Sequence, residues 1–166
     1  MALDTPLDRV LAKAKSENRA ALIAYIPAGF PSHEGCKKVI AAFAEGAMSQ
    51  GVNVIDIGLA STDLLYFAAG SLDAPGAMFT ASHNPAQYNG IKFCLSGARP
   101  VGVDTGLNQI REVAVRELAQ PSASVAGRGQ LSQRNLLDAF ADHVVSFVDQ
   151  DQLIPLKVVA DTANGM

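Results

Sequence analysis

Four residues at or near position 82 carry groups that could take part in phosphoryl transfer. Ser82 has a hydroxyl that becomes a covalent phosphoryl donor once it is phosphorylated. His83 can donate a hydrogen bond or a proton, and Asn84 can orient an anion without adding charge. Lys92 can neutralise phosphate oxygens or move a proton. Phosphoryl transfer needs mainly positioning and charge neutralisation, so these residues fit a phosphoryl-transfer loop. A plain turn remains the alternative, because Ser, His and Asn are ordinary turn residues.

Two predicted strands position these groups. An apolar strand over 76–81 leads into the polar cluster, and Pro85 fixes the backbone there and cannot continue a sheet ladder. A second strand is expected over 90–95. Its alternation puts Ile91 and Phe93 on one face and Lys92 on the other. The lysine would therefore return toward the serine from a neighbouring strand.

The remaining pattern alternates strand-like and helix-like segments. Further strands are expected at 20–26, 52–59 and 156–160. Helices are expected at 5–16, from Ser32 to Gly51, at 61–71, from Thr105 to about 119, and from Ser132 onward. The core face of the helix from Ser32 would carry Val39, Ile40, Phe43 and Ala47. A loop or flexible connection is expected at 120–129. This order predicts an α/β fold, a three-layer sandwich with a mostly parallel sheet. Ligands on such sheets bind at the carboxyl ends of strands, here after Ile26, Leu59 and Ala81.

Composition narrows the classes of function. The 166 residues carry a net charge of −3 and contain no run of Lys or Arg, so nucleic acid and anionic membranes are poor candidate partners. No signal peptide and no membrane span is expected, and a cytoplasmic location follows. Cys36 and Cys94 are far apart without metal-ligand spacing, and are expected to be reduced thiols. The sequence is silent on oligomeric state.

The run from Thr80 to Pro85, followed by the run from Tyr88 to Lys92, closely resembles the phosphoserine signature of the α-D-phosphohexomutases. The nearest subgroup is the bacterial phosphomannomutase/phosphoglucomutase type. Segments 58–63, 100–102 and 156–165 are also similar to that family. On this resemblance, residues 41–150 correspond to the family's first domain, which carries the phosphoserine loop, and 151–166 to the start of its second.

The resemblance implies a set of roles. Ser82 would give its phosphoryl group to a hexose phosphate and take another back from the hexose 1,6-bisphosphate intermediate, and its phosphate would be one ligand of Mg²⁺. His83 and Lys92 would be the acid/base and phosphate-contact groups, with their order in the two half-reactions left open. Thr80, Asn84 and Asn89 would support the substrate and phosphate loop.

The chain departs from that family at several motifs. This sequence lacks two N-terminal motifs of the family, the Tyr-Asp-x-Arg-Gly segment and the Gly-Arg-Asp strand end. It also lacks the Asp-Gly-Asp-Gly-Asp-Arg metal loop, the loop that selects the sugar and the C-terminal phosphate-binding domain. Three metal carboxylates are therefore missing, and Mg²⁺ is expected to bind weakly or not at all. We expect an incomplete phosphohexomutase with negligible mutase turnover, and the preferred hexose cannot be read from the sequence.

Residues 1–40 resemble a different family. The run from Glu17 to Ser32 is similar to the first strand and loop of the tryptophan synthase α subunit, a TIM barrel, so the chain looks chimeric. Asp56 occupies a place similar to that family's catalytic glutamate, although a strand residue near a turn is the simpler interpretation. Two alternatives therefore stay open, a lyase fragment of the tryptophan synthase α type and an inert α/β module that at most binds sugar phosphate.

Overall fold

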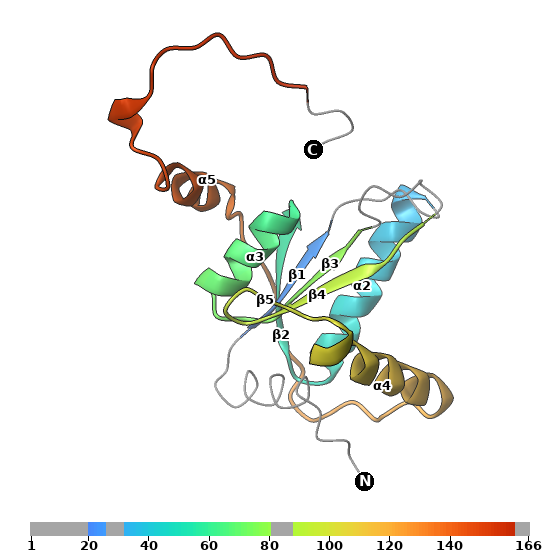
Figure 1. The fold of residues 1–166 in the computed structure, drawn as a ribbon. Coiled ribbons are helices and arrows are strands. Elements are labelled where there is room, and N and C mark those ends of the chain that lie inside the picture. The colour runs from blue at the N-terminus through green and yellow to red at the C-terminus, as the bar shows by residue number, and fades with distance from the viewer. Residues whose placement is uncertain (1–19, 26–31, 81–87, 162–166) are drawn as a thin grey trace.

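The structure, a computed structural model, describes residues 20–25, 32–80 and 88–161. A six-stranded sheet in the order β5-β4-β3-β1-β2-β6 forms its centre, with helices on both faces (Figure 1). The elements are β1 Ala20–Tyr25, α2 His33–Ser49, β2 Asn53–Leu59, α3 Thr62–Ser71, β3 Gly76–Phe79, β4 Ile91–Leu95, β5 Arg99–Pro100, a 3₁₀ turn Val103–Thr105, α4 Leu107–Ala119, β6 Leu131–Gln133, α5 Leu137–Val145 and a 3₁₀ turn Gln150–Gln152. The helix predicted at 5–16 lies outside the described residues.

The sheet is parallel at its centre and antiparallel at one side. β1 pairs in parallel with both β2 and β3, and β2 pairs in parallel with β6. β4 is antiparallel to β3, and β5 is antiparallel to β4. The predicted α/β fold with a mostly parallel sheet is therefore confirmed. Among the described residues, no helix combines the length and apolar character that a membrane span requires.

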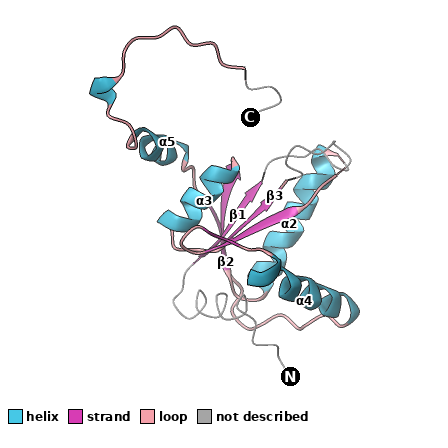
Figure 2. Cartoon of the chain, viewed as in Figure 1, coloured by secondary structure: helices cyan, strands magenta, loops and turns pink. Residues whose placement is uncertain are grey.

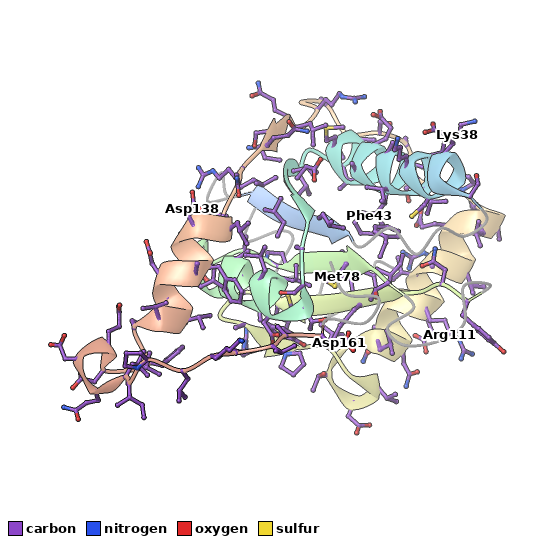
Figure 3. All side chains as sticks on the ribbon, turned by 90° about the horizontal axis from the view of Figure 1, so that it is seen from above. Lys38, Phe43, Met78, Arg111, Asp138 and Asp161 are labelled. Atoms are coloured by element: carbon purple, nitrogen blue, oxygen red, sulfur yellow. The ribbon has the colours of Figure 1, made fainter. Side chains whose placement is uncertain are left out.

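Helices α2 and α3 lie on opposite faces of the sheet (Figure 2). An apolar cluster of buried side chains holds each helix there. On the α2 face, the buried side chains are Cys36, Ile40, Ala44, Met48, Val54 and Phe79. On the α3 face, they are Ile55, Ile57, Ala60, Leu64, Leu65, Ala68, Ala69, Ala74, Met78 and Cys94. Successive strand residues alternate between the clusters, as Met78 and Phe79 do, because side chains alternate along a strand. In Figure 3, Phe43 points from α2 toward the sheet while Lys38 points away.

Serine caps begin the two helices that cover the sheet. The Ser32 hydroxyl accepts a hydrogen bond from the Gly35 amide at 3.1 Å, and the Ser61 hydroxyl accepts one from the Leu64 amide at 3.1 Å. Each satisfies a backbone donor that the first turn leaves unpaired. The predicted starts of both helices are confirmed, as is the end of the first near Gly51, whose φ of 77° suits glycine.

Two predicted helix features are wrong. Val39 is 47% exposed rather than in the core, and Cys36, Ala44 and Met48 extend the buried face instead, since the helix is rotated toward them. Thr105 does not cap α4. Its hydroxyl accepts a hydrogen bond from the Gly102 amide at 2.7 Å in the preceding 3₁₀ turn, which leaves Gly106 at the N-cap.

The region after 129 also differs from the prediction. Ser132 lies in β6 instead of opening a helix, because residues 131–133 pair with β2, and α5 begins at Leu137. The strand predicted at 156–160 is absent. Val158 and Val159 are 78% and 91% exposed there, and a strand forms only where a neighbour accepts its backbone hydrogen bonds. The predicted loop at 120–129 is confirmed.

Candidate active site

The carboxyl ends of the three central parallel strands meet at one edge of the sheet. Tyr25 is paired with Leu59 of β2 and with Phe79 of β3. The helix after β1 packs on one face and the helix after β2 on the other, so the two connections diverge at this edge. Ligands of open α/β sheets bind where connections diverge in this way. The carboxyl edge is therefore the candidate site.

A β-bulge shapes the end of β2 at this edge. Ile23 is opposite Asp56, but Tyr25 is opposite Leu59, so β2 carries one extra residue. Gly58 lies in this interval with φ of 70°, a left-handed conformation that glycine adopts without steric cost. Its amide donates to Asp56 Oδ1 at 2.8 Å. Asp56 is thus a strand residue next to a turn, as the simpler interpretation predicted.

A backbone hydrogen bond closes the base of the candidate loop. The Thr80 amide donates to the Gly90 carbonyl oxygen at 3.0 Å, and Asn89 Oδ1 accepts from the Gly90 amide at 2.8 Å. A side chain at position 90 would approach the Thr80 carbonyl oxygen to 3.3 Å, so glycine allows this close pairing. The loop between these residues therefore starts and ends at the carboxyl edge. Ser82, His83 and Asn84 lie outside the described residues, and their roles stay predictions.

Lys92 lies on the α3 face of the sheet, beside this loop base. It is opposite Met78 in the β3–β4 ladder, and its Nζ is 5.6 Å from the centroid of the Tyr66 ring. Phe93 faces the other way, with its ring 6.3 Å from that of Phe43 on α2. The predicted alternation along this strand is confirmed.

Sequence reasoning placed the connection after Leu59 at this edge but missed Tyr66. Ser61 and Thr62 begin α3 directly after β2, and Thr62 Oγ1 donates to Met78 Sδ at 3.8 Å. Tyr66 follows one turn later. A usable signal existed, since Lys92 was predicted on the face opposite Phe93 and a helix was predicted to follow β2. What the sequence could not supply was the rotation of that helix, which decides which side chain meets the ammonium.

Burial alters the titration of two groups near the site. Burial raises the pKa of the Tyr66 phenol above its ordinary value of 10.0, with a smaller contribution from Cys94. Burial likewise raises the pKa of the Cys94 thiol above 9.0. A thiol in that state is a poor nucleophile. Both cysteines are free and buried, which agrees with two structural thiols and gives them no part in the site.

The residues in the described ranges do not fit a magnesium site by themselves. No group of three or more His, Cys, Asp and Glu side chains comes together there. Magnesium favours several carboxylate, phosphate or water oxygens in near-octahedral geometry. The weak or absent Mg²⁺ binding expected from the sequence stays a prediction.

Comparison with known proteins identifies the family. The model of phosphoglucomutase/phosphomannomutase, alpha/beta/alpha domain I, matches residues 24–120. The chain belongs to the phosphoglucomutase/phosphomannomutase family. The matched region contains β2, α3, β3 and β4. It therefore includes every element that forms the candidate edge, except for the first residues of β1.

Relatives within this phosphohexomutase family extend the match. Phosphomannomutase of Escherichia coli (strain K12) is 41% identical over 125 residues, which is 75% of this chain and 27% of that protein. The phosphohexose mutases of Xanthomonas campestris pv. campestris (strain B100) are 39% identical over 125 residues, again 75% and 27%. The chain thus spans about a quarter of the length of these relatives. A phosphoglucomutase/phosphomannomutase family protein from Burkholderia thailandensis has a similar fold, with TM-score 0.60 and 24% identity, covering 87% of this chain and 32% of that one.

The resemblance of residues 1–40 to the tryptophan synthase α subunit finds no support in these comparisons. The family model begins at residue 24, inside that segment. The predicted boundaries at 40 and 150 stay predictions.

Proposed function

We propose that this chain carries the phosphoserine loop of a phosphohexomutase, with Ser82 as the phosphoryl carrier. One observation carries the proposal. Lys92 lies on β4 near the carboxyl edge, where the backbone hydrogen bond from Thr80 to Gly90 closes the base of the loop. A cation beside a loop at that edge is what a phosphate dianion needs. Membership of the family supports the same assignment.

The transfer is a displacement at phosphorus. A hydroxyl oxygen of a hexose monophosphate forms a new bond to the phosphorus of phosphoserine 82, and the bond from phosphorus to Ser82 Oγ breaks. The sugar hydroxyl gives up its proton, and Oγ takes one. Return of a phosphoryl group from the hexose 1,6-bisphosphate reverses these changes. His83 and Lys92 supply the proton transfers and the phosphate contacts, Asn84 supports the loop, and Thr80 and Asn89 fix its base.

The substrates follow from the relatives. Proteins named phosphomannomutase and phosphohexose mutase are similar to this chain, so we propose hexose phosphates and hexose 1,6-bisphosphate as its ligands. Magnesium, when bound, neutralises charge on the transferring phosphoryl group. Its further ligands would have to come from outside the described residues, because the described ones form no metal cluster. We therefore expect phosphorylation at Ser82 without significant mutase turnover by the 166-residue chain.

Phosphorylation by a bisphosphate tests this function. The chain is incubated with glucose 1,6-bisphosphate and Mg²⁺, and its intact mass is followed over time. One phosphoryl group should be gained, and Ser82→Ala should gain none. Lys92→Met should slow the gain on the order of 10²-fold, the usual effect of removing one charged or proton-transferring group. Exposed Lys37→Met on α2 is the matched control and should leave the rate unchanged.

Two results would contradict the proposal. A wild-type chain that stays unphosphorylated while correctly folded would leave an α/β module without transfer activity. Full turnover of mannose 1-phosphate in a coupled assay would show instead that the missing motifs are not required.

A further inference from the structure

We propose that Tyr66 is a positioning residue for Lys92, whose ammonium it holds over its ring face beside the loop base. The relevance of this contact to phosphoryl transfer rests on the proposed function. The contact itself does not, because both residues are described and their geometry is independent of Ser82. No catalytic part is assigned to the tyrosine, which acts only through the lysine.

The distance fits a cation–π interaction. Lys92 Nζ is 5.6 Å from the ring centroid of Tyr66, inside the range of about 6 Å over which an ammonium is attracted to the negative face of an aromatic ring. Lys92 is an exposed residue with a long flexible stem. In the described part of the chain, the ion pairs join Lys37 to Glu34, Arg116 to Glu117 and Arg128 to Glu45, so the ring takes the place of a carboxylate partner for Lys92.

The backbones that carry the two side chains are fixed by the core on the α3 face. Leu65, next to Tyr66, is completely buried, and so is Met78, the ladder partner of Lys92. Cys94, two residues after the lysine on the same face, is 2% exposed. The Thr62 hydroxyl contacts Met78 Sδ at 3.8 Å and ties the first turn of α3 to β3. The ring is partly buried and packs against the apolar cluster on this face, while the lysine is exposed.

The chemical state of the ring suits this role. Burial raises the pKa of the Tyr66 phenol, so at neutral pH the hydroxyl keeps its proton and the ring stays uncharged. An uncharged ring attracts the ammonium without neutralising it, whereas a carboxylate would compete with the phosphate for the same charge. A lysine held in this way remains available to a dianion.

Nuclear magnetic resonance of the labelled amine tests the contact. Lysines of the full chain are reductively methylated with ¹³C-formaldehyde, and the Lys92 signal is identified by its loss in Lys92→Arg. A methyl group above an aromatic ring is shifted upfield by the ring current. We expect this shift in the wild type and in Tyr66→Phe, which keeps the ring, and its loss in Tyr66→Leu. Phe147→Leu, which removes a 73% exposed ring in the turn after α5, is the matched control and should leave the shift unchanged.

A rate measurement links the contact to function. In the bisphosphate assay, Tyr66→Leu should phosphorylate about two- to fivefold more slowly than the wild type, as expected for an exposed cation–π contact, and Tyr66→Phe should match the wild type. Circular dichroism verifies that both variants fold.

The outcomes separate the two proposals. An unchanged Lys92 shift in folded Tyr66→Leu overturns the positioning role. A shift lost in Tyr66→Leu and kept in Tyr66→Phe supports it, even if no variant is phosphorylated, and in that case only the proposed phosphoryl transfer fails. A lost shift with an unchanged phosphorylation rate overturns the functional part of the inference.

Discussion

Helices α3 and α5 are similar in length but differ sharply in burial. α3 has 10 residues and buries Leu64, Leu65, Ala68 and Ala69, whereas α5 has 9 residues and buries none. The same contrast holds between α2, which lies on a buried cluster, and α4, which has no buried residue. After α5 the chain extends away from the sheet (Figure 1). The candidate edge is therefore built by residues 33–95 with β1, while α4 and α5 bury no residue of their own.

A pair of leucine substitutions tests this contrast with the largest expected effect. Leu65→Ala removes a completely buried side chain and should lower the free energy of unfolding by about 2–5 kcal/mol, through lost burial and a cavity. Leu118→Ala on α4 removes a side chain that is 85% exposed and should change it by less than about 0.5 kcal/mol. Urea denaturation followed by circular dichroism measures both. Equal effects would show that the two regions do not differ in packing.

Two glycines sharpen the boundary between the regions. A side chain at Gly129, just before β6, would overlap the carbonyl oxygen of Val52, and we expect Gly129→Ala to cost about 1–3 kcal/mol, as overpacking usually does. At Gly102 the nearest atom to an added Cβ is Thr105 Oγ1 at 3.7 Å, an ordinary contact. Gly102→Ala should therefore be nearly neutral in the same urea titration. A neutral Gly129→Ala would mean that β6 does not pair with β2.

Helix caps give a smaller effect. Ser61→Ala removes the hydroxyl that accepts from the Leu64 amide and should lower the free energy of unfolding by about 0.5–2 kcal/mol. Thr105→Ala, before α4, removes a hydroxyl that is not the N-cap, and water can replace it at the exposed Gly102 amide, so the cost should be about 0.5 kcal/mol, the low end for a hydrogen bond. Thermal unfolding monitored at 222 nm compares the two variants. The reverse ranking would contradict the assigned caps.

The ion pair between Glu45 and Arg128 gives the smallest effect. The hydrogen bond from Arg128 holds the pKa of the Glu45 carboxyl below its ordinary value of 4.5. A depressed pKa in the folded state contributes stability above about pH 4.5, and this contribution is lost as the pH falls through the folded-state pKa. Arg128→Gln should therefore lower the urea midpoint slightly at pH 7, and the difference from the wild type should shrink by pH 3. A constant difference across that range would contradict the pairing.

Local signals allowed the sequence to predict the central layers. Ser32 and Ser61 mark helix starts because a capping hydroxyl acts within three residues of its own position. Lys92 could be assigned a face because alternation along a strand is also local. Thr105 misled the prediction for the same reason, since its hydroxyl bonds locally to Gly102 in a turn that precedes the helix.

Non-local pairing explains most of what could not be predicted. β6 has three residues and exists because it pairs with β2, far away in the chain, and so short a segment has no periodicity of its own. Residues 156–160 have a strand-like pattern but no strand partner in the described part of the chain. At the site, the contact between Lys92 and Tyr66 depends on how α3 is rotated against β4, which packing decides.

Peptide mapping by mass spectrometry after incubation with glucose 1,6-bisphosphate and Mg²⁺ tests the central claim most directly. The neighbouring hydroxyls of Ser61, Thr62 and Thr80 lie at or beside the same edge and serve as internal controls. We predict phosphate on Ser82, with none on these three residues and none in the Ser82→Ala variant. Phosphate on another hydroxyl, or a folded chain that gains none, would contradict the assignment of Ser82 as the phosphoryl carrier.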